Sequence, residues 1–108
     1  MEQPDTKNIM NLIVNAGAAK SCAMEAIQLA KKNQLTAALT KMDSAKSFLN
    51  KAHNQQSQLL FQEAKGANSP VTLLGVHAQD HLMTAITFCD LAQEIINLYQ
   101  TIFQLKKE

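Results

Sequence analysis

Residues 88–105 read FCDLAQEIINLYQTIFQL, and their apolar positions recur at steps of three and four residues. That period is typical of an amphipathic α-helix. Six apolar residues form one seam along it: Phe88, Leu91, Ile95, Leu98, Ile102 and Leu105. A second apolar set lies on another side of the same helix: Leu82, Met83, Ile86, Cys89, Ile96 and Phe103. A helix that is apolar on two sides is usually buried on two sides, so this stretch predicts packing within the chain and against further copies of it.

The same rhythm runs through the rest of the chain and predicts helices at about 5–32, 35–65 and 70–105. Asn33 and Gly66 follow the first two helices, and both residue types readily take the left-handed conformation that ends a helix. Short connections make neighbouring helices antiparallel. The expected fold class is therefore all-α, an antiparallel three-helix bundle.

Two residue pairs predict where helices begin. Asp5 and Thr6 suit an N-cap, and Ser69 followed by Pro70 suits an N-cap and a first helical position. We therefore expect the first and third helices to begin at these pairs.

The composition limits the size and the core of the protein. A chain of 108 residues, with 46% hydrophobic residues, 5% aromatic residues and no Trp, predicts a single domain over 1–108 with a core of Ala, Leu, Ile and Met. Gly17 follows Ala16 and precedes Ala18 and Ala19. We expect Gly17 to permit close approach of a neighbouring helix.

The charged residues exclude several classes of function. Ten Lys and no Arg oppose nine acids, for a net charge of +1, and the lysines are spread out, which argues against nucleic acid as a partner. Without Arg, a phosphate would be held without a bidentate guanidinium. The chain shows neither an export signal nor a long apolar run, so we expect a cytoplasmic protein. Cys22 and Cys89 are isolated, which favours reduced thiols over a disulfide.

Polar residues interrupt the helix-three seam near its start. Continued backwards from Phe88, the seam reaches Thr84, His81 and His77. At about 100° per residue, His77 and His81 lie about 40° apart, with Asp80 about 60° to the other side of His77. Titratable groups on an apolar background are costly to bury unless they are paired or useful.

The residues alone leave four interpretations of this cluster. The histidines could be core residues whose tautomer Asp80 fixes. His77 and His81, four apart on a helix, could ligate zinc with a third ligand from elsewhere. A Cys–His nucleophile is less favoured, because neither cysteine is near the pair in sequence. Finally, one imidazole could itself be the nucleophile of phosphoryl transfer, since neutral imidazole is nucleophilic near pH 7.

Residues 72–85, TLLGVHAQDHLMTA, resemble the signature of the lactose/cellobiose-class enzyme IIA proteins of the bacterial phosphoenolpyruvate-dependent sugar phosphotransferase system. Residues 13–21 resemble the first-helix segment of this family, and residues 52–56 and 63–66 resemble its second. The likeness covers nearly the whole chain. Gly75 is a departure, because a bulkier apolar residue is more usual there.

The resemblance implies a homotrimer of three-helix subunits that acts as a phosphocarrier, a phosphotransferase component rather than a stand-alone catalyst. His77 would take a phosphoryl group from HPr and pass it to a cysteine of enzyme IIB, and through it to the membrane component IIC. His81 would orient His77 or hydrogen-bond the phosphate. Asp80 would face the trimer axis, where a shared divalent cation, Mg²⁺ by its preference for oxygen ligands, would relieve the repulsion between three carboxylates.

The remaining implications concern supporting residues and the substrate. Gln79 and Gln56 are candidate amide donors near the phosphate or else ordinary packing or surface residues. For His53 a structural hydrogen bond at a subunit contact is favoured over a catalytic part. The sugar stays open among lactose, cellobiose, chitobiose and related β-glucosides. The alternative function is a metal-binding or structural helical oligomer in which His77 and His81 are the ligands.

Overall fold

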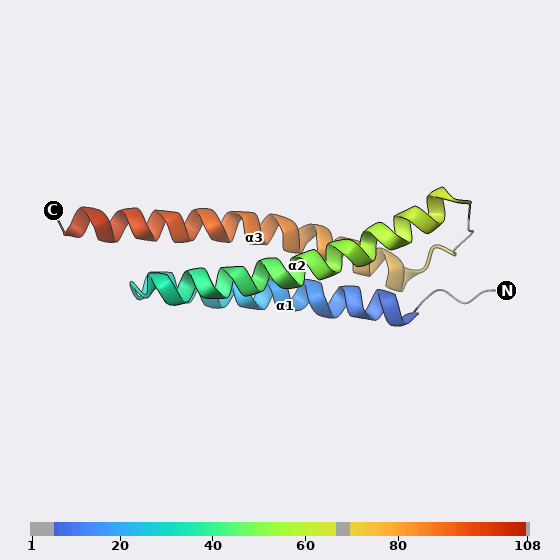
Figure 1. The fold of residues 1–108 in the computed structure, drawn as a ribbon, viewed down its shortest axis with the longest axis horizontal. Helices are drawn as coiled ribbons and strands as arrows, with labels where there is room; N and C mark the ends of the chain where they lie inside the picture. Colours follow the sequence, from blue (N-terminus) through green and yellow to red (C-terminus); the bar gives the residue numbers. More distant parts are fainter. Residues whose placement is uncertain (1–5, 67–69, 108) are drawn as a thin grey trace.

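Three α-helices account for nearly all of the residues that the computed structural model describes, 6–66 and 70–107. They are α1 (Thr6–Lys31), α2 (Leu35–Ala64) and α3 (Leu73–Lys106). The helices alternate in direction, so α1 and α3 run parallel and α2 runs against both (Figure 1). The result is a rod of 66 × 19 × 19 Å. The all-α, antiparallel three-helix prediction is confirmed for the subunit.

Left-handed residues end the first two helices. Asn33, after α1, has a φ of 61°, and Gly66, after α2, has a φ of 87°. At the first of these ends, the backbone N–H of Gln34 donates to the carbonyl of Leu29 at 2.9 Å. This bond turns the chain within three residues, so α2 starts immediately beside the end of α1.

The third helix begins later than the sequence predicts. The prediction placed its start at Pro70, whereas Pro70 precedes α3 and the N-cap is Thr72. The side-chain oxygen of Thr72 accepts a hydrogen bond from the backbone N–H of Gly75 at 3.0 Å. Thr72 has the extended backbone that an N-cap requires. Because its hydroxyl caps the helix, α3 begins after Thr72 and not at Pro70. The other proposed cap residues, Ser69 and Asp5, lie outside the described residues.

Alanine dominates the buried surface between the helices. The largest fully buried side chains are Leu12, Met42, Leu82 and Ile96. The other buried residues are mostly small: Ala16, Ala19, Ala23, Ala26, Ala30, Ala38, Ala45, Ala52, Ala78, Ala85 and Ala92. Small side chains let helix backbones approach closely, which explains a core that contains no aromatic residue in the described part of the chain.

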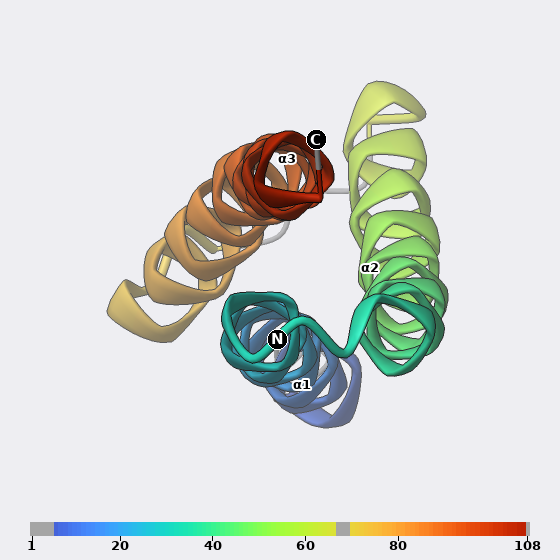
Figure 2. The same cartoon turned by 90° about the vertical axis from the view of Figure 1, so that its left-hand side faces the viewer.

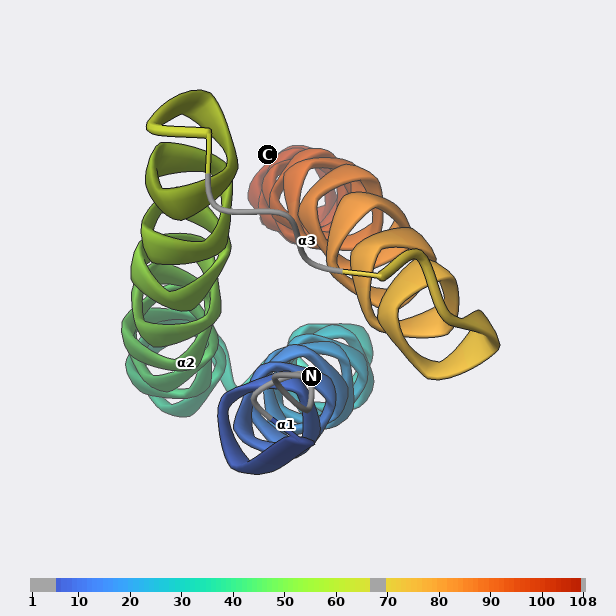
Figure 3. The same ribbon diagram turned by 90° about the vertical axis from the view of Figure 1, so that its right-hand side faces the viewer.

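The three helices are not equally close along their length. Viewed along the rod, they occupy the corners of a triangle (Figure 2). At the end that carries the start of α3, α2 and α3 have moved apart (Figure 3). This splayed end of the bundle contains the cluster that interrupts the seam, because His77 is the fifth residue of α3.

The two apolar sides of α3 have different surroundings. The inner side packs on the other helices, with Leu82 and Ile96 fully buried and Met83 as an exposed exception. The outer seam is exposed in the single chain. Phe88 is the exception, half-buried against the core. The other five members, which we call the outer stripe, have exposed fractions of 37% to 63%: Leu91, Ile95, Leu98, Ile102 and Leu105. An exposed apolar stripe of this kind is typical of a protein–protein or membrane interaction site.

The interpretation of Gly17 as a packing glycine is wrong. A Cβ atom built on Gly17 would meet one atom within 4 Å in the described part of the chain, Nε2 of His81 at 3.8 Å. That is an ordinary van der Waals distance, so alanine would fit between α1 and α3. Glycine in a helix interior costs roughly 0.5–1 kcal/mol relative to alanine, and helix packing does not explain that cost.

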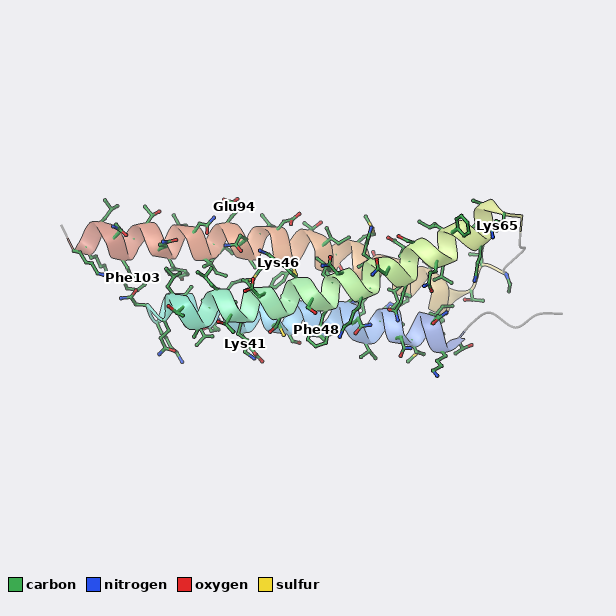
Figure 4. All side chains as sticks on the ribbon, in the orientation of Figure 1. Lys41, Lys46, Phe48, Lys65, Glu94 and Phe103 are labelled. Carbon is green, nitrogen blue, oxygen red and sulfur yellow. The ribbon has the colours of Figure 1, made fainter. Side chains whose placement is uncertain are left out.

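Charged side chains lie on the outside of the rod. Lys41 on α2 and Glu94 on α3 point into solvent on opposite sides (Figure 4). Nζ of Lys41 lies 2.7 Å from Oε2 of Glu25 on α1, an exposed ion pair of the kind that contributes little stability. Over residues 6–66 and 70–107, no helix has the length and apolarity that a membrane span requires.

Replacing Leu82 with alanine should destabilise the protein strongly. Leu82 is 0% exposed and packs with Leu12, Ala16 and Ala78 in one of the two core clusters. Removing its side chain leaves a cavity that helices already in contact cannot close, at a cost of about 2–5 kcal/mol. Urea unfolding at a fixed protein concentration measures this cost.

The matched control is Leu39→Ala, the same substitution at a residue of α2 that is 43% exposed. It should cost about 1 kcal/mol or less, because most of its side chain already contacts water. Equal losses for the two variants would contradict the assignment of Leu82 to the core.

Candidate active site

Two histidines and a carboxylate lie close together on the first turns of α3. His77 and Asp80 are exposed, and His81 is half-buried. The imidazole rings of His77 and His81 have centroids 5.5 Å apart and planes tilted by 38°. The neighbours Val76 and Met83 are 53% and 54% exposed. The result is an accessible imidazole on an apolar surface, with a second imidazole within one turn of helix.

The hydroxyl at the next seam position bonds within its own helix. Oγ1 of Thr84 lies 3.0 Å from the carbonyl oxygen of Asp80 and 3.1 Å from that of His81. Such back-bonding satisfies the hydroxyl locally. The Thr84 hydroxyl can therefore lie in an apolar seam with its hydrogen bonds made inside α3.

Gln56 and Gln79, the two candidate amide donors, form a hydrogen bond with each other. Nε2 of Gln56 on α2 donates to Oε1 of Gln79 on α3, and it also lies 3.9 Å from Sδ of Met83. Both glutamines are half-buried. Their hydrogen bond spans the gap where α2 and α3 begin to separate, so it fixes the position of α2 relative to the helix that carries the histidines.

His53 lies apart from this pair. It is exposed on α2, one turn before Gln56. In the part of the chain that the structure describes, no hydrogen bond joins His53 to the histidines of α3. The role of His53 at a subunit contact stays a prediction.

A cavity of about 200 Å³ lies beside the site, between the splayed ends of the helices. Ten residues line it: Ile9, Leu59, Gln62, Glu63, Pro70, Val71, Thr72, Gly75, Val76 and Gln79. Gly75, the departure from the family pattern, thus faces this cavity. A Cβ atom at Gly75 would lie 3.3 Å from Oγ1 of Thr72, so a larger residue there would have to displace the capping hydroxyl slightly.

The first helix contributes to the site in ways that the sequence did not predict. Gly17 lies opposite Nε2 of His81, as described above. Two residues earlier on α1, Nδ2 of Asn15 donates to Oε1 of Gln55 on α2 at 3.3 Å. The likeness of residues 13–21 to a family segment was the available signal, but it did not say which residue of α3 the segment faces.

The cysteines do not belong to the site. Cys89 is buried, and its Sγ lies 3.8 Å from the carbonyl oxygen of Ala19. Burial raises the pKa of the Cys89 thiol, and the nearby charge of Asp90 adds to this effect. A protonated thiol in the core is a poor nucleophile, which argues against the Cys–His interpretation. Both cysteines are free thiols, as the sequence predicts.

One chain supplies few ligands for a metal ion. Among residues 6–66 and 70–107, no three His, Cys, Asp or Glu side chains lie together as a metal-binding group. Asp80 offers one exposed carboxylate. A cation held at this carboxylate would need oxygen ligands from other copies of the chain or from water.

Comparison with known proteins gives consistent matches along the chain. Residues 7–100 match the family described as the lactose/cellobiose-specific IIA subunit of the phosphotransferase system. The lichenan-specific phosphotransferase enzyme IIA component of Bacillus subtilis (strain 168) is 47% identical over 94 residues, which cover 87% of this chain and 86% of that protein.

Solved structures agree with the sequence matches. The crystal structure of the cellobiose-specific enzyme IIA from Bacillus anthracis has a TM-score of 0.91 and 41% identity, and it covers 96% of this chain and 95% of its own. A chain of the IIA(chitobiose)–HPr complex from the N,N'-diacetylchitobiose branch of the Escherichia coli phosphotransferase system has a TM-score of 0.80 and 36% identity. That match covers 94% of this chain and 98% of the other.

Proposed function

Because the chain belongs to the lactose/cellobiose-specific IIA family of the sugar phosphotransferase system, we propose that it carries a phosphoryl group on His77. The observation that carries this proposal is the exposed imidazole of His77, with the His81 ring 5.5 Å away, inside the segment that the family match covers. The metal-binding or structural oligomer is the less favoured function, because the match extends over residues 7–100 and not over the histidines alone.

The proposed reaction consists of two transfers. In the first, a ring nitrogen of His77 attacks phosphorus while the bond to the histidine nitrogen of phospho-HPr breaks. In the second, a cysteine thiolate of enzyme IIB attacks the same phosphorus, and the bond to His77 breaks. Each transfer needs positioning and charge stabilisation. In this proposal His81, one turn along the helix, donates a hydrogen bond to a phosphoryl oxygen.

Exposure of His77 suits a carrier that meets two proteins in turn. HPr is the partner of the related IIA(chitobiose) in the solution structures, and its presence there supports HPr as the donor for this chain. Transient docking requires an accessible apolar surface without deep burial of the reacting group. Val76 and Met83 beside His77 provide such a surface.

We further propose that the active protein is a homotrimer assembled through the outer stripe of α3. The stripe continues the line of His77 and Asp80 along the helix, so packing the stripe between copies brings these polar residues toward the same interface. Three Asp80 carboxylates near one axis would repel each other, and a divalent cation such as Mg²⁺ would reduce that repulsion through oxygen coordination.

The sugar belongs to the β-linked class in this proposal. The named relatives act in systems for lichenan, cellobiose and N,N'-diacetylchitobiose. The chain itself handles only the phosphoryl group, so the identity of the sugar follows from the membrane component that it serves.

Incubation with phosphoenolpyruvate, enzyme I and HPr tests the carrier function directly. Intact-mass measurement should show one phosphoryl group on the chain, and the modification should be labile in acid, as a phosphoramidate is. Adding enzyme IIB should remove it. A chain that stays unmodified while HPr is phosphorylated would overturn the proposal.

The Asp80→Leu substitution should preserve or strengthen the oligomer. If Asp80 brings charge to the axis, replacing it with an apolar residue removes the repulsion and adds about 1–4 kcal/mol of stability to the assembly. Light scattering over a dilution series measures the oligomeric state, and thermal unfolding measures its stability.

Chelation completes this test. Excess chelator should weaken the wild-type oligomer and leave the Asp80→Leu oligomer unchanged. Dissociation of Asp80→Leu into monomers would contradict an axial role for Asp80.

A further inference from the structure

Gly17 occupies a position in α1 where helix packing leaves room for a side chain. Its place in the middle of α1 makes a glycine unfavourable there. An added Cβ atom would touch no backbone of α2 or α3 within 4 Å in the described part of the chain. The lack of a side chain at Gly17 is therefore not explained by close approach of the helices.

The single atom that the Cβ would meet belongs to the candidate site. Nε2 of His81 would lie 3.8 Å from it. A hydrogen-bond partner of this nitrogen must approach to about 2.7–3.2 Å, closer than the methyl group would stand. On the side of His81 that faces α1, a methyl group and a hydrogen-bonding oxygen would compete for the same space.

We propose that Gly17 is a positioning residue for phosphoryl transfer, because it leaves the α1-facing side of His81 Nε2 open to an oxygen of the phosphoryl group on His77. This inference rests on the proposed carrier function. His81 and Gly17 are both half-buried, and the only atom near a Cβ built on Gly17 in the described part of the chain is Nε2 of His81. The ring of His77, which carries the group, lies one turn away at a centroid distance of 5.5 Å.

The Gly17→Ala variant should gain stability and lose activity. The melting temperature should rise by a few degrees, because alanine is the better helix former and fits the available space. The rate of transfer from phospho-HPr should fall about tenfold, the effect of losing a hydrogen bond to a charged group. The fall should appear in kcat, with KM for phospho-HPr unchanged, because the hydrogen bond that Gly17 permits is made to the phosphoryl group and not to HPr.

Two further variants separate this role from a general effect on α1. Asn11 is exposed on the same helix, so Asn11→Ala should raise the melting temperature without changing the rate. In a His81→Ala background, Gly17→Ala should have no additional effect on the rate, because the nitrogen that it covers is gone.

Three results would contradict the proposed role of Gly17. Equal rates for wild type and Gly17→Ala would overturn the inference and leave the carrier function intact. An equal fall in the His81→Ala background would also overturn it, as would a lower melting temperature for Gly17→Ala, which would show that the space is not available. A wild-type chain that accepts no phosphoryl group would refute the proposed function itself.

Discussion

Replacing His77 with alanine should abolish phosphoryl acceptance. The reaction needs a nucleophilic nitrogen that phospho-HPr can reach, and His77 provides an exposed imidazole in the family-matched segment of α3. Removing a nucleophile typically lowers the rate by at least about a thousandfold. After incubation with phosphoenolpyruvate, enzyme I and HPr, the variant should keep its unmodified mass while the wild type gains one phosphoryl group.

The other two histidines are the natural controls for this experiment. His53→Ala should be phosphorylated at close to the wild-type rate, because His53 lies on α2 with no hydrogen bond to the pair in the described part of the chain. His81→Ala should still accept the phosphoryl group, but more slowly, since His81 hydrogen-bonds the group in this proposal and His77 carries it. Full phosphorylation of His77→Ala would place the acceptor elsewhere and refute the assignment.

Two aspartates in the outer stripe, Leu98→Asp and Ile102→Asp together, should convert the oligomer into monomers. Leu98 is 59% exposed and Ile102 is 37% exposed, so neither is central to the core of the subunit. Burying unpaired carboxylates between copies costs several kcal/mol each. The dissociation constant should rise by at least about a thousandfold, and light scattering should report the 11.9 kDa monomer.

The same charge on the polar side of α3 provides the control. Asn97 is exposed and accepts a hydrogen bond from Nε2 of Gln93 at 3.0 Å, which an aspartate can also accept. Asn97→Asp should leave the oligomer intact. The helical circular dichroism of the double variant should stay near the wild-type value, because the subunit core is untouched. A wild type that is itself monomeric would contradict assembly through the outer stripe.

Helical periodicity predicted the elements well because the core is uniform. Alanines and larger apolar residues recur at steps of three and four residues, and the left-handed residues Asn33 and Gly66 mark the two helix ends. The start of α3 was misplaced by three residues. Pro70 and Thr72 both suit a helix start, and sequence rules do not rank them. The hydrogen bond from the Gly75 N–H to Thr72 Oγ1 marks Thr72 as the N-cap, because it satisfies a free backbone donor of the first turn.

The site was predicted less completely than the fold. His77, Asp80 and His81 lie on one helix, so a rotation of about 100° per residue was enough to place them on one side. The partners of the site lie on other helices. Gln56 and Gln79 were candidate amide donors or ordinary packing residues, and the structure adds that Gln56 donates to Oε1 of Gln79 across the bundle.

The sequence by itself determined three helices, an alanine-rich core and a histidine pair on a doubly apolar third helix. These features depend on residues close together in the chain, which periodicity relates directly. Only the tertiary structure decided that Gly17 faces Nε2 of His81, that α2 and α3 separate beside the site, and that the outer stripe is left exposed. Each of these depends on how one helix is rotated and placed against another, and many small side chains in contact determine that placement together.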